Sequence, residues 1–79
     1  MVKLKNIKKS HDLISCDFFP EDAQNSGHIE YNITNNEVIR CDYPEGYEWC
    51  DSHLSHAVDY LSSVANDDNI PESKLIMWY

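Results

Sequence analysis

The sequence has few basic residues and few glycines, and it lacks long apolar runs. No apolar stretch approaches the roughly 20 residues that a membrane-spanning helix needs. The residues from Met1 to Lys5 lack the apolar segment of a secretion signal. These absences predict a cytoplasmic protein without a membrane partner.

The scarcity of glycine and cysteine argues against several chemistries. Gly27 and Gly46 are the only glycines, so the chain has no glycine-rich loop for phosphates. The cysteines, Cys16, Cys41 and Cys50, are odd in number and unpaired in spacing, which disfavours a disulfide scaffold and a Cys-x-x-Cys redox pair. We expect free thiols, buried or half-buried, and no cofactor.

Basic residues lie mainly near the two ends of the chain. The sequence holds 14 acidic and 6 basic side chains, a net charge of −8. Residues 10–73 contain every acidic residue but, of the basic ones, only Arg40. Because such a chain repels nucleic acid and anionic membranes, we expect neither as a partner. The charge fits plain solubility, a basic protein partner or mimicry of a nucleic acid.

The remaining composition is typical of a globular protein, with 42% AVILMFWYC residues and 25% charged residues. A chain of 79 residues is long enough for one domain, residues 1–79, and too short for two. Alternating apolar residues predict four strands before a helix and one after it. The strands are residues 2–7, 13–19, 28–33, 37–43 and 74–79.

The helix has the clearest pattern. Its buried stripe follows the i, i+3, i+4, i+7 spacing through Leu54, Ala57, Val58, Leu61, Val64 and Ala65. Asp51 or Ser52 is placed to cap its N-terminus. The opposite side is polar and reads as a solvated face.

This β-β-β-β-α-β order predicts an α+β fold with an antiparallel sheet in the strand order 5-1-2-3-4. Short connections make the first four strands a meander, and the helix then packs on one face as the chain returns beside the first strand. Lys74 is expected near Lys3 and Lys5, which gives the sheet a basic side and an acidic side.

Alternation also assigns the two faces of the sheet. The side chains expected to face the helix are Ile14, Cys16, Phe18, Ile29, Tyr31, Ile33, Ile39, Cys41, Tyr43, Ile76 and Trp78. The other face is mixed, and its apolar members are Leu13, Phe19, Val38, Leu75, Met77 and Tyr79. A contiguous apolar patch there indicates an interface, whereas scattered apolar side chains are ordinary surface residues.

Residues 43–51 form an acidic and aromatic loop, because Pro44 and Gly46 disfavour a helix. Tyr47, Glu48 and Trp49 are candidate contact residues, since aromatic side chains are enriched at interface centres. In the alternative, Tyr43 and Trp49 pack over the end of the core.

Cys50, His53, His56 and Asp59 carry the side chains of a zinc site at steps of three. The spacing matches no standard zinc pattern, and a solvated helix face explains the same residues. A triad of Ser, His and Asp on this helix would lack a cleft and an oxyanion hole, so we expect no enzyme.

Four short motifs resemble a group of short uncharacterised proteins of Gram-positive bacteria. The motifs are Phe18-Phe19-Pro20-Glu21, Gly27-His28-Ile29, Ser55-His56-Ala57 and Ile76-Met77-Trp78-Tyr79. The resemblance implies a small bacterial cytosolic protein and carries no activity or site residues.

The leading hypothesis is a protein-interaction module that uses the face without the helix and the 43–51 loop, and that can form a homodimer. The alternative is an acidic inhibitor that mimics a nucleic acid. A more distant hypothesis is metal binding between Cys50 and Asp59.

Overall fold

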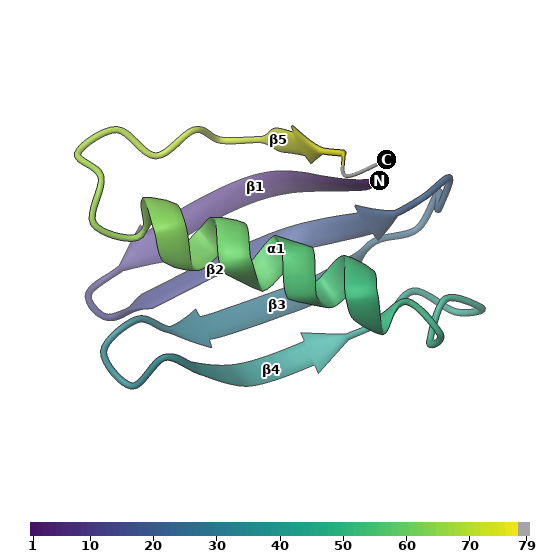
Figure 1. The fold of residues 1–79 in the computed structure, drawn as a ribbon, viewed down its shortest axis with the longest axis horizontal. Coiled ribbons are helices and arrows are strands. Elements are labelled where there is room, and N and C mark those ends of the chain that lie inside the picture. Colours follow the sequence, from purple (N-terminus) through teal and green to yellow (C-terminus); the bar gives the residue numbers. More distant parts are fainter. Residues whose placement is uncertain (78–79) are drawn as a thin grey trace.

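A five-stranded antiparallel sheet and one helix form the fold, in a computed structural model that describes residues 1–77. The elements are β1 (Val2–Ser10), β2 (Leu13–Pro20), β3 (Gly27–Asn32), β4 (Glu37–Asp42), α1 (Asp51–Val64) and β5 (Lys74–Ile76). The strand order β4-β3-β2-β1-β5 confirms the predicted α+β topology, and α1 lies across one face (Figure 1). The expectations for Trp78 and Tyr79 lie outside the described residues.

Tight connections set the register of the meander. His11 and Asn36 adopt positive φ angles of 56° and 53° in the turns between β1 and β2 and between β3 and β4. The second turn is also held by Asn32, whose side-chain oxygen accepts a hydrogen bond from the amide of Asn35 at 2.9 Å. Such turns allow neighbouring strands to pair antiparallel without long loops.

The core lies between α1 and the sheet. Its most completely buried large side chains include Leu4, Ile14, Phe18, Ile29 and Leu61. These side chains follow the alternation of the strands and the stripe of the helix, as predicted. Each fully buried side chain of this kind contributes about 1.5–3 kcal/mol to folding.

Gly27, at the start of β3, allows two strands and a core ring to approach closely. A Cβ atom at this position would overlap both the ring of Phe18 and the carbonyl oxygen of Asp42. The packing at this end of the sheet therefore requires a residue without a side chain.

The predicted face of Val38 on β4 is wrong. The register shifts between Glu30 and Tyr31, so that Val38 lies opposite Tyr31 on the side of the helix. Ile39, which was expected to be buried beneath the helix, has no opposite residue on β3 and is 54% exposed. The cause is a β-bulge, which inserts one residue and reverses the alternation beyond it.

The predicted helix cap also needs correction. α1 begins at Asp51 after Cys50, and no side chain among residues 1–77 caps its N-terminus. The Asp51 carboxylate instead accepts a hydrogen bond from the Tyr43 hydroxyl at 2.7 Å. The buried stripe is confirmed at Ala57 and Leu61 and extends back to His53, which is 5% exposed.

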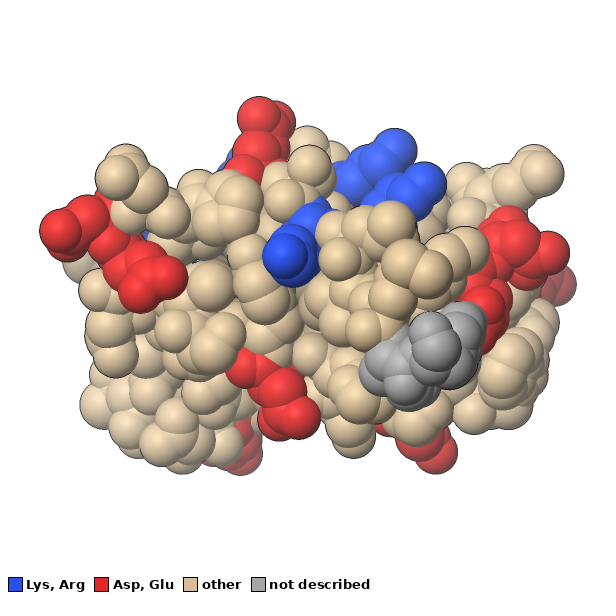
Figure 2. Space-filling view, turned by 45° about the horizontal axis from the view of Figure 1, so that its top comes forward, with Lys and Arg blue, Asp and Glu red and all other residues tan. Residues whose placement is uncertain are grey.

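Positive charge follows β1 and β5. Lys74 of β5 lies opposite Leu4 of β1, a strand with four lysines. Figure 2, which brings the β5 side forward, shows basic side chains in its upper middle and acidic ones around them, including at both ends. The predicted basic edge is therefore present. No helix within residues 1–77 is long and apolar enough to cross a lipid bilayer.

Candidate functional site

The loop of residues 43–51, here called the aromatic loop, joins β4 to α1 through two successive turns. The amide of Tyr47 donates to the carbonyl oxygen of Pro44 at 3.0 Å, and the amide of Cys50 donates to that of Tyr47 at 3.1 Å. Between them Gly46 adopts a φ of 86°, which is strained for any residue with a side chain. The backbone thus gives the loop side chains defined positions.

Trp49 is the most exposed large apolar side chain of the described residues, at 65%. Three contacts nevertheless hold its ring. The indole Nε1 donates to the carbonyl oxygen of Gly46 at 3.0 Å. The ring stacks on Tyr47 with centroids 6.2 Å apart, and it meets His53 edge-on at 5.7 Å. An exposed ring that is already ordered loses little entropy when a partner covers it.

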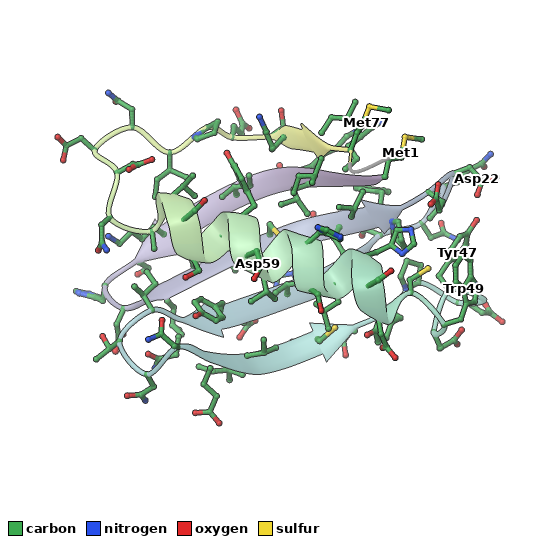
Figure 3. All side chains as sticks on the ribbon, in the orientation of Figure 1. Met1, Asp22, Tyr47, Trp49, Asp59 and Met77 are labelled. Atoms are coloured by element: carbon green, nitrogen blue, oxygen red, sulfur yellow. The ribbon has the colours of Figure 1, made fainter. Side chains whose placement is uncertain are left out.

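The aromatic loop and the first turn of α1 contact the loop of residues 21–26. The Tyr47 hydroxyl donates to Asp22 Oδ1 at 2.8 Å, and His53 Nε2 lies 2.8 Å from Glu21 Oε1. The hydrogen bond to Asp22 raises the pKa of Tyr47. Figure 3 shows Asp22, Tyr47 and Trp49 together at one end of the molecule. The two loops therefore form one surface.

This surface is rich in carboxylates, which come from both loops and from the start of α1. We call it the acidic aromatic end, and it consists of Glu21, Asp22, Glu45, Tyr47, Glu48, Trp49 and Asp51. Residues 41–73 contain no lysine or arginine, and the terminal ammonium group of Met1 contacts Glu21 at 3.3 Å. Burial, followed by the hydrogen bond to Asp51, raises the pKa of Tyr43 at the base of the loop. The end is therefore negatively charged at neutral pH.

A pocket of about 400 Å³ lies between this end and β1. It is lined by Met1, Lys3, Lys5, Phe19, Glu21, Asp22, Ala23 and Gln24. The Lys5 ammonium group lies 5.3 Å from the centre of the Phe19 ring. The lining contains two lysines and two acidic residues, so it does not select a small ion of one sign.

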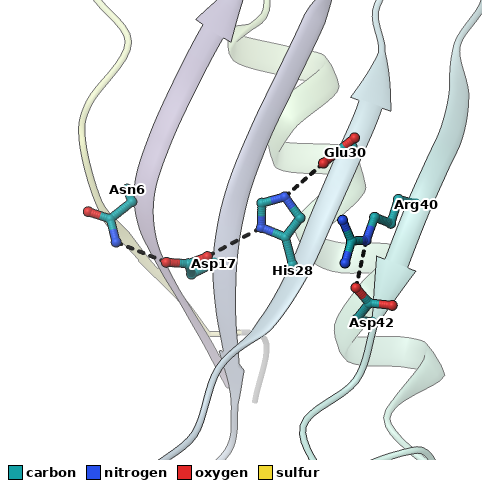
Figure 4. A network of polar contacts seen from close by, with 6 residues as sticks. All are labelled: Asn6, Asp17, His28, Glu30, Arg40 and Asp42. Carbon is teal, nitrogen blue, oxygen red and sulfur yellow. Dashed lines mark hydrogen bonds and ion pairs between the residues drawn. The ribbon is translucent and has the colours of Figure 1, made fainter.

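The face of the sheet without the helix, here called the open face, has a polar centre (Figure 4). Asp17 accepts a hydrogen bond from the side-chain amide of Asn6 at 2.9 Å and lies 3.3 Å from His28 Nδ1. His28 Nε2 lies 3.0 Å from Glu30. The contacts with Asn6 and His28 hold the pKa of Asp17 below its ordinary value. Polar side chains outside and apolar ones inside are typical of a half-solvated antiparallel sheet.

This polar centre separates the apolar side chains that were assigned to this face. Leu13 and Phe19 both lie on the open face, six residues apart on β2, which is about 20 Å. Leu75 lies opposite Lys3, and Lys3 lies opposite Phe19, so Leu75 is at the same end of the open face as Phe19. Met77 is 59% exposed. The apolar side chains on the two sides of the polar centre are therefore separate, and Tyr79 lies outside the described residues.

The structure does not assemble the predicted metal ligands. Cys50 is buried at the start of α1, His53 points to Glu21, and Asp59 is exposed further along the helix. Among residues 1–77, no group of three or more His, Cys, Asp or Glu side chains has a geometry that can hold a metal ion. Steps of three drift around a helix, so these side chains leave it in different directions.

The three thiols are free, as expected. Burial raises the pKa of Cys16 to about 12 and also raises the pKa of Cys41 and of Cys50. All three are therefore protonated near neutral pH and are poor nucleophiles.

The roles of Asp22 and His53 were not predicted from the sequence. His53 stands four residues before Ala57, so the helical period itself places it on the buried stripe. No local pattern pairs it with Glu21 or pairs Asp22 with Tyr47, because these partners are separated by 32 and 25 residues.

Comparisons with protein-family models, curated proteins and solved structures found no match to this chain. The resemblance to short proteins of Gram-positive bacteria therefore stays a prediction.

Proposed function

We propose that this protein is a small interaction module that binds a basic segment of another protein at its acidic aromatic end. The observation that supports this most is Trp49, an indole ring that is 65% exposed and yet held by Gly46, Tyr47 and His53. Residues that dominate binding energy are commonly ordered aromatic side chains of this kind.

The chemistry of the surface favours a cationic partner. A guanidinium or ammonium group is attracted to the face of an indole ring, and the contact is worth about 0.5–2 kcal/mol. Asp22 and Glu48 add acceptors for the hydrogen bonds of the same cation. Arginine fits best, because its planar group stacks on a ring while its N–H groups reach a carboxylate.

The alternative, an inhibitor that mimics a nucleic acid, has less support. It requires rows of unpaired carboxylates on one surface. On the open face, however, Asp17 and Glu30 both contact His28, and Asp42 accepts a hydrogen bond from Arg40 at 2.7 Å. These acidic groups therefore already have polar partners within the chain.

The test measures binding of an arginine-rich peptide by isothermal titration calorimetry. A peptide with every arginine replaced by glutamine serves as the control ligand. We expect Trp49→Ala to weaken binding about tenfold, and Glu48→Gln to weaken it less. Asp67→Asn, beyond the opposite end of α1, removes the same charge as Glu48→Gln and leaves binding unchanged. Added salt weakens binding because the contacts are electrostatic.

Two results with the variants would overturn the proposal. One is equal affinity of the wild type and a folded Trp49→Ala variant for the arginine-rich peptide. The other is equal weakening by Asp67→Asn and Glu48→Gln, which would show attraction to net charge rather than to this surface. Failure of the wild type to bind the peptide at all also counts against it.

A further inference from the structure

The two edges of the sheet differ in length and in what they expose. β5 forms one edge with three residues, and β4 forms the other with six. α1 leaves the outer side of β4 uncovered (Figure 1). Two apolar side chains of β4, Val38 and Ile39, are 37% and 54% exposed. An edge strand of this kind carries unpaired backbone groups that can pair with another strand.

The bulge gives β4 an unusual pattern of charge. Glu37 lies opposite Asn32 and Arg40 lies opposite Glu30. Glu30 and Asn32 are two residues apart on β3 and share the open face, so Glu37 and Arg40 share it as well. In a regular strand, residues three apart point to opposite faces. The bulge therefore brings one acidic and one basic side chain to the same face, on either side of the exposed apolar pair.

We propose that β4 pairs antiparallel with β4 of a second copy of this chain. Glu37 of each copy then lies opposite Arg40 of the other, and Val38 lies opposite Ile39. A two-fold axis relates the copies, so each contact forms twice. The pairing joins two five-stranded sheets into one continuous sheet with both helices on the same side. It leaves the acidic aromatic end available, so it adds a second interface to the one proposed above.

Charge selects this register over its neighbours. A shift that places Glu37 opposite Asp42 brings two carboxylates together, and a shift that places Arg40 opposite itself brings two guanidinium groups together. Like charges directly opposite each other destabilise a strand pair, whereas opposite charges stabilise it. Arg40 uses its Nε to contact Asp42, and its terminal N–H groups can donate to Glu37 of the second copy.

The test is sedimentation equilibrium over a range of protein concentrations. At the highest concentrations, the wild type is expected to reach twice the 9.2 kDa of one chain. Glu37→Arg and Arg40→Glu each place like charges opposite each other and raise the dissociation constant of the dimer about tenfold or more. The double variant exchanges the two charges, keeps the net charge and restores the wild-type constant. Glu72→Arg, with the same charge change as Glu37→Arg, has no effect.

A wild type that remains a monomer at millimolar concentration overturns the proposal. Dimerisation of both single variants with the wild-type constant does so too, because the interface then lies elsewhere. Ile39→Lys gives a second route, since Ile39 is exposed and its replacement leaves the core intact. If this variant is folded by circular dichroism and still dimerises, β4 is not the interface. Trp49→Ala is expected to dimerise as the wild type does, which separates this interface from the proposed function.

Discussion

The two faces of the sheet follow the same alternation but have different roles. On the covered face, side chains such as Phe18 and Ile29 are fully buried beneath α1. On the open face, the neighbouring positions Asp17 and His28 form polar contacts and are about one-third exposed. Buried apolar area supplies most of the folding free energy, so the covered face determines stability. The open face and the loops beyond it are free to carry charge and binding groups.

The adjacent residues Phe18 and Phe19 provide the most direct test of whether the two faces differ in their contribution to stability. Phe18→Ala removes a ring that is fully buried, and it should lower the free energy of unfolding by about 3–5 kcal/mol. That is a large part of the stability of a domain this small. Phe19→Ala removes the same atoms from the open face, where the ring is half-buried beside Lys5, and should cost about 1 kcal/mol. Urea unfolding measures both, and equal losses would contradict the assignment of the two faces.

Substitution of Gly27, which packs against the covered face, should lower the free energy of unfolding by a smaller amount. Gly27→Ala places a methyl group into space occupied by the Phe18 ring and the Asp42 carbonyl oxygen. The backbone carbonyl cannot move without disturbing β4, so we expect a loss of about 1–3 kcal/mol in the free energy of unfolding. Ser26→Ala, at the exposed preceding position, is the matched control and should be nearly neutral. A stable Gly27→Ala variant would show that this end of the sheet is more loosely packed.

The covered face was largely predictable because its signals are periodic. Alternation located the strands and the helical stripe located α1, including Ala57 and Leu61. Short connections and the return of the chain after α1 then restricted the strand order to the one observed. These inferences needed only local patterns and chain length.

The remaining features depend on single residues or distant pairs. The β4 bulge could not be predicted, because Val38 and Ile39 are both apolar and fit either face. The polar centre of the open face depends on pairs from different strands, such as Asn6 with Asp17. The exposure of Trp49 depends on how the aromatic loop folds back on His53. Composition showed that the loop is acidic and aromatic, but it did not show which ring is buried.

Substitution of Asp17 is expected to have the smallest effect on the free energy of unfolding. The pH dependence of this effect distinguishes loss of the carboxylate charge from other causes. The hydrogen bond from Asn6, together with the contact with His28, lowers the pKa of Asp17 in the folded protein. The ionised carboxylate therefore stabilises the fold. This stabilisation is complete above the pKa of the unfolded chain, about 4, and is lost as the pH falls through the lower pKa of the folded protein.

Asp17→Asn removes this contribution at every pH. Because the site is about one-third exposed, we expect a loss of only about 0.5–1 kcal/mol near pH 7. The difference between the variant and the wild type should then shrink as the pH falls below about 4, where the wild-type carboxylate takes up a proton. Asp59→Asn, on the exposed side of α1, is the control for removal of a carboxylate elsewhere on the surface. Urea unfolding across this pH range measures the difference. If it stays constant with pH, the open face contributes through the shape of its side chains, and the comparison between an apolar face that stabilises by burial and a polar face that stabilises by charge no longer holds.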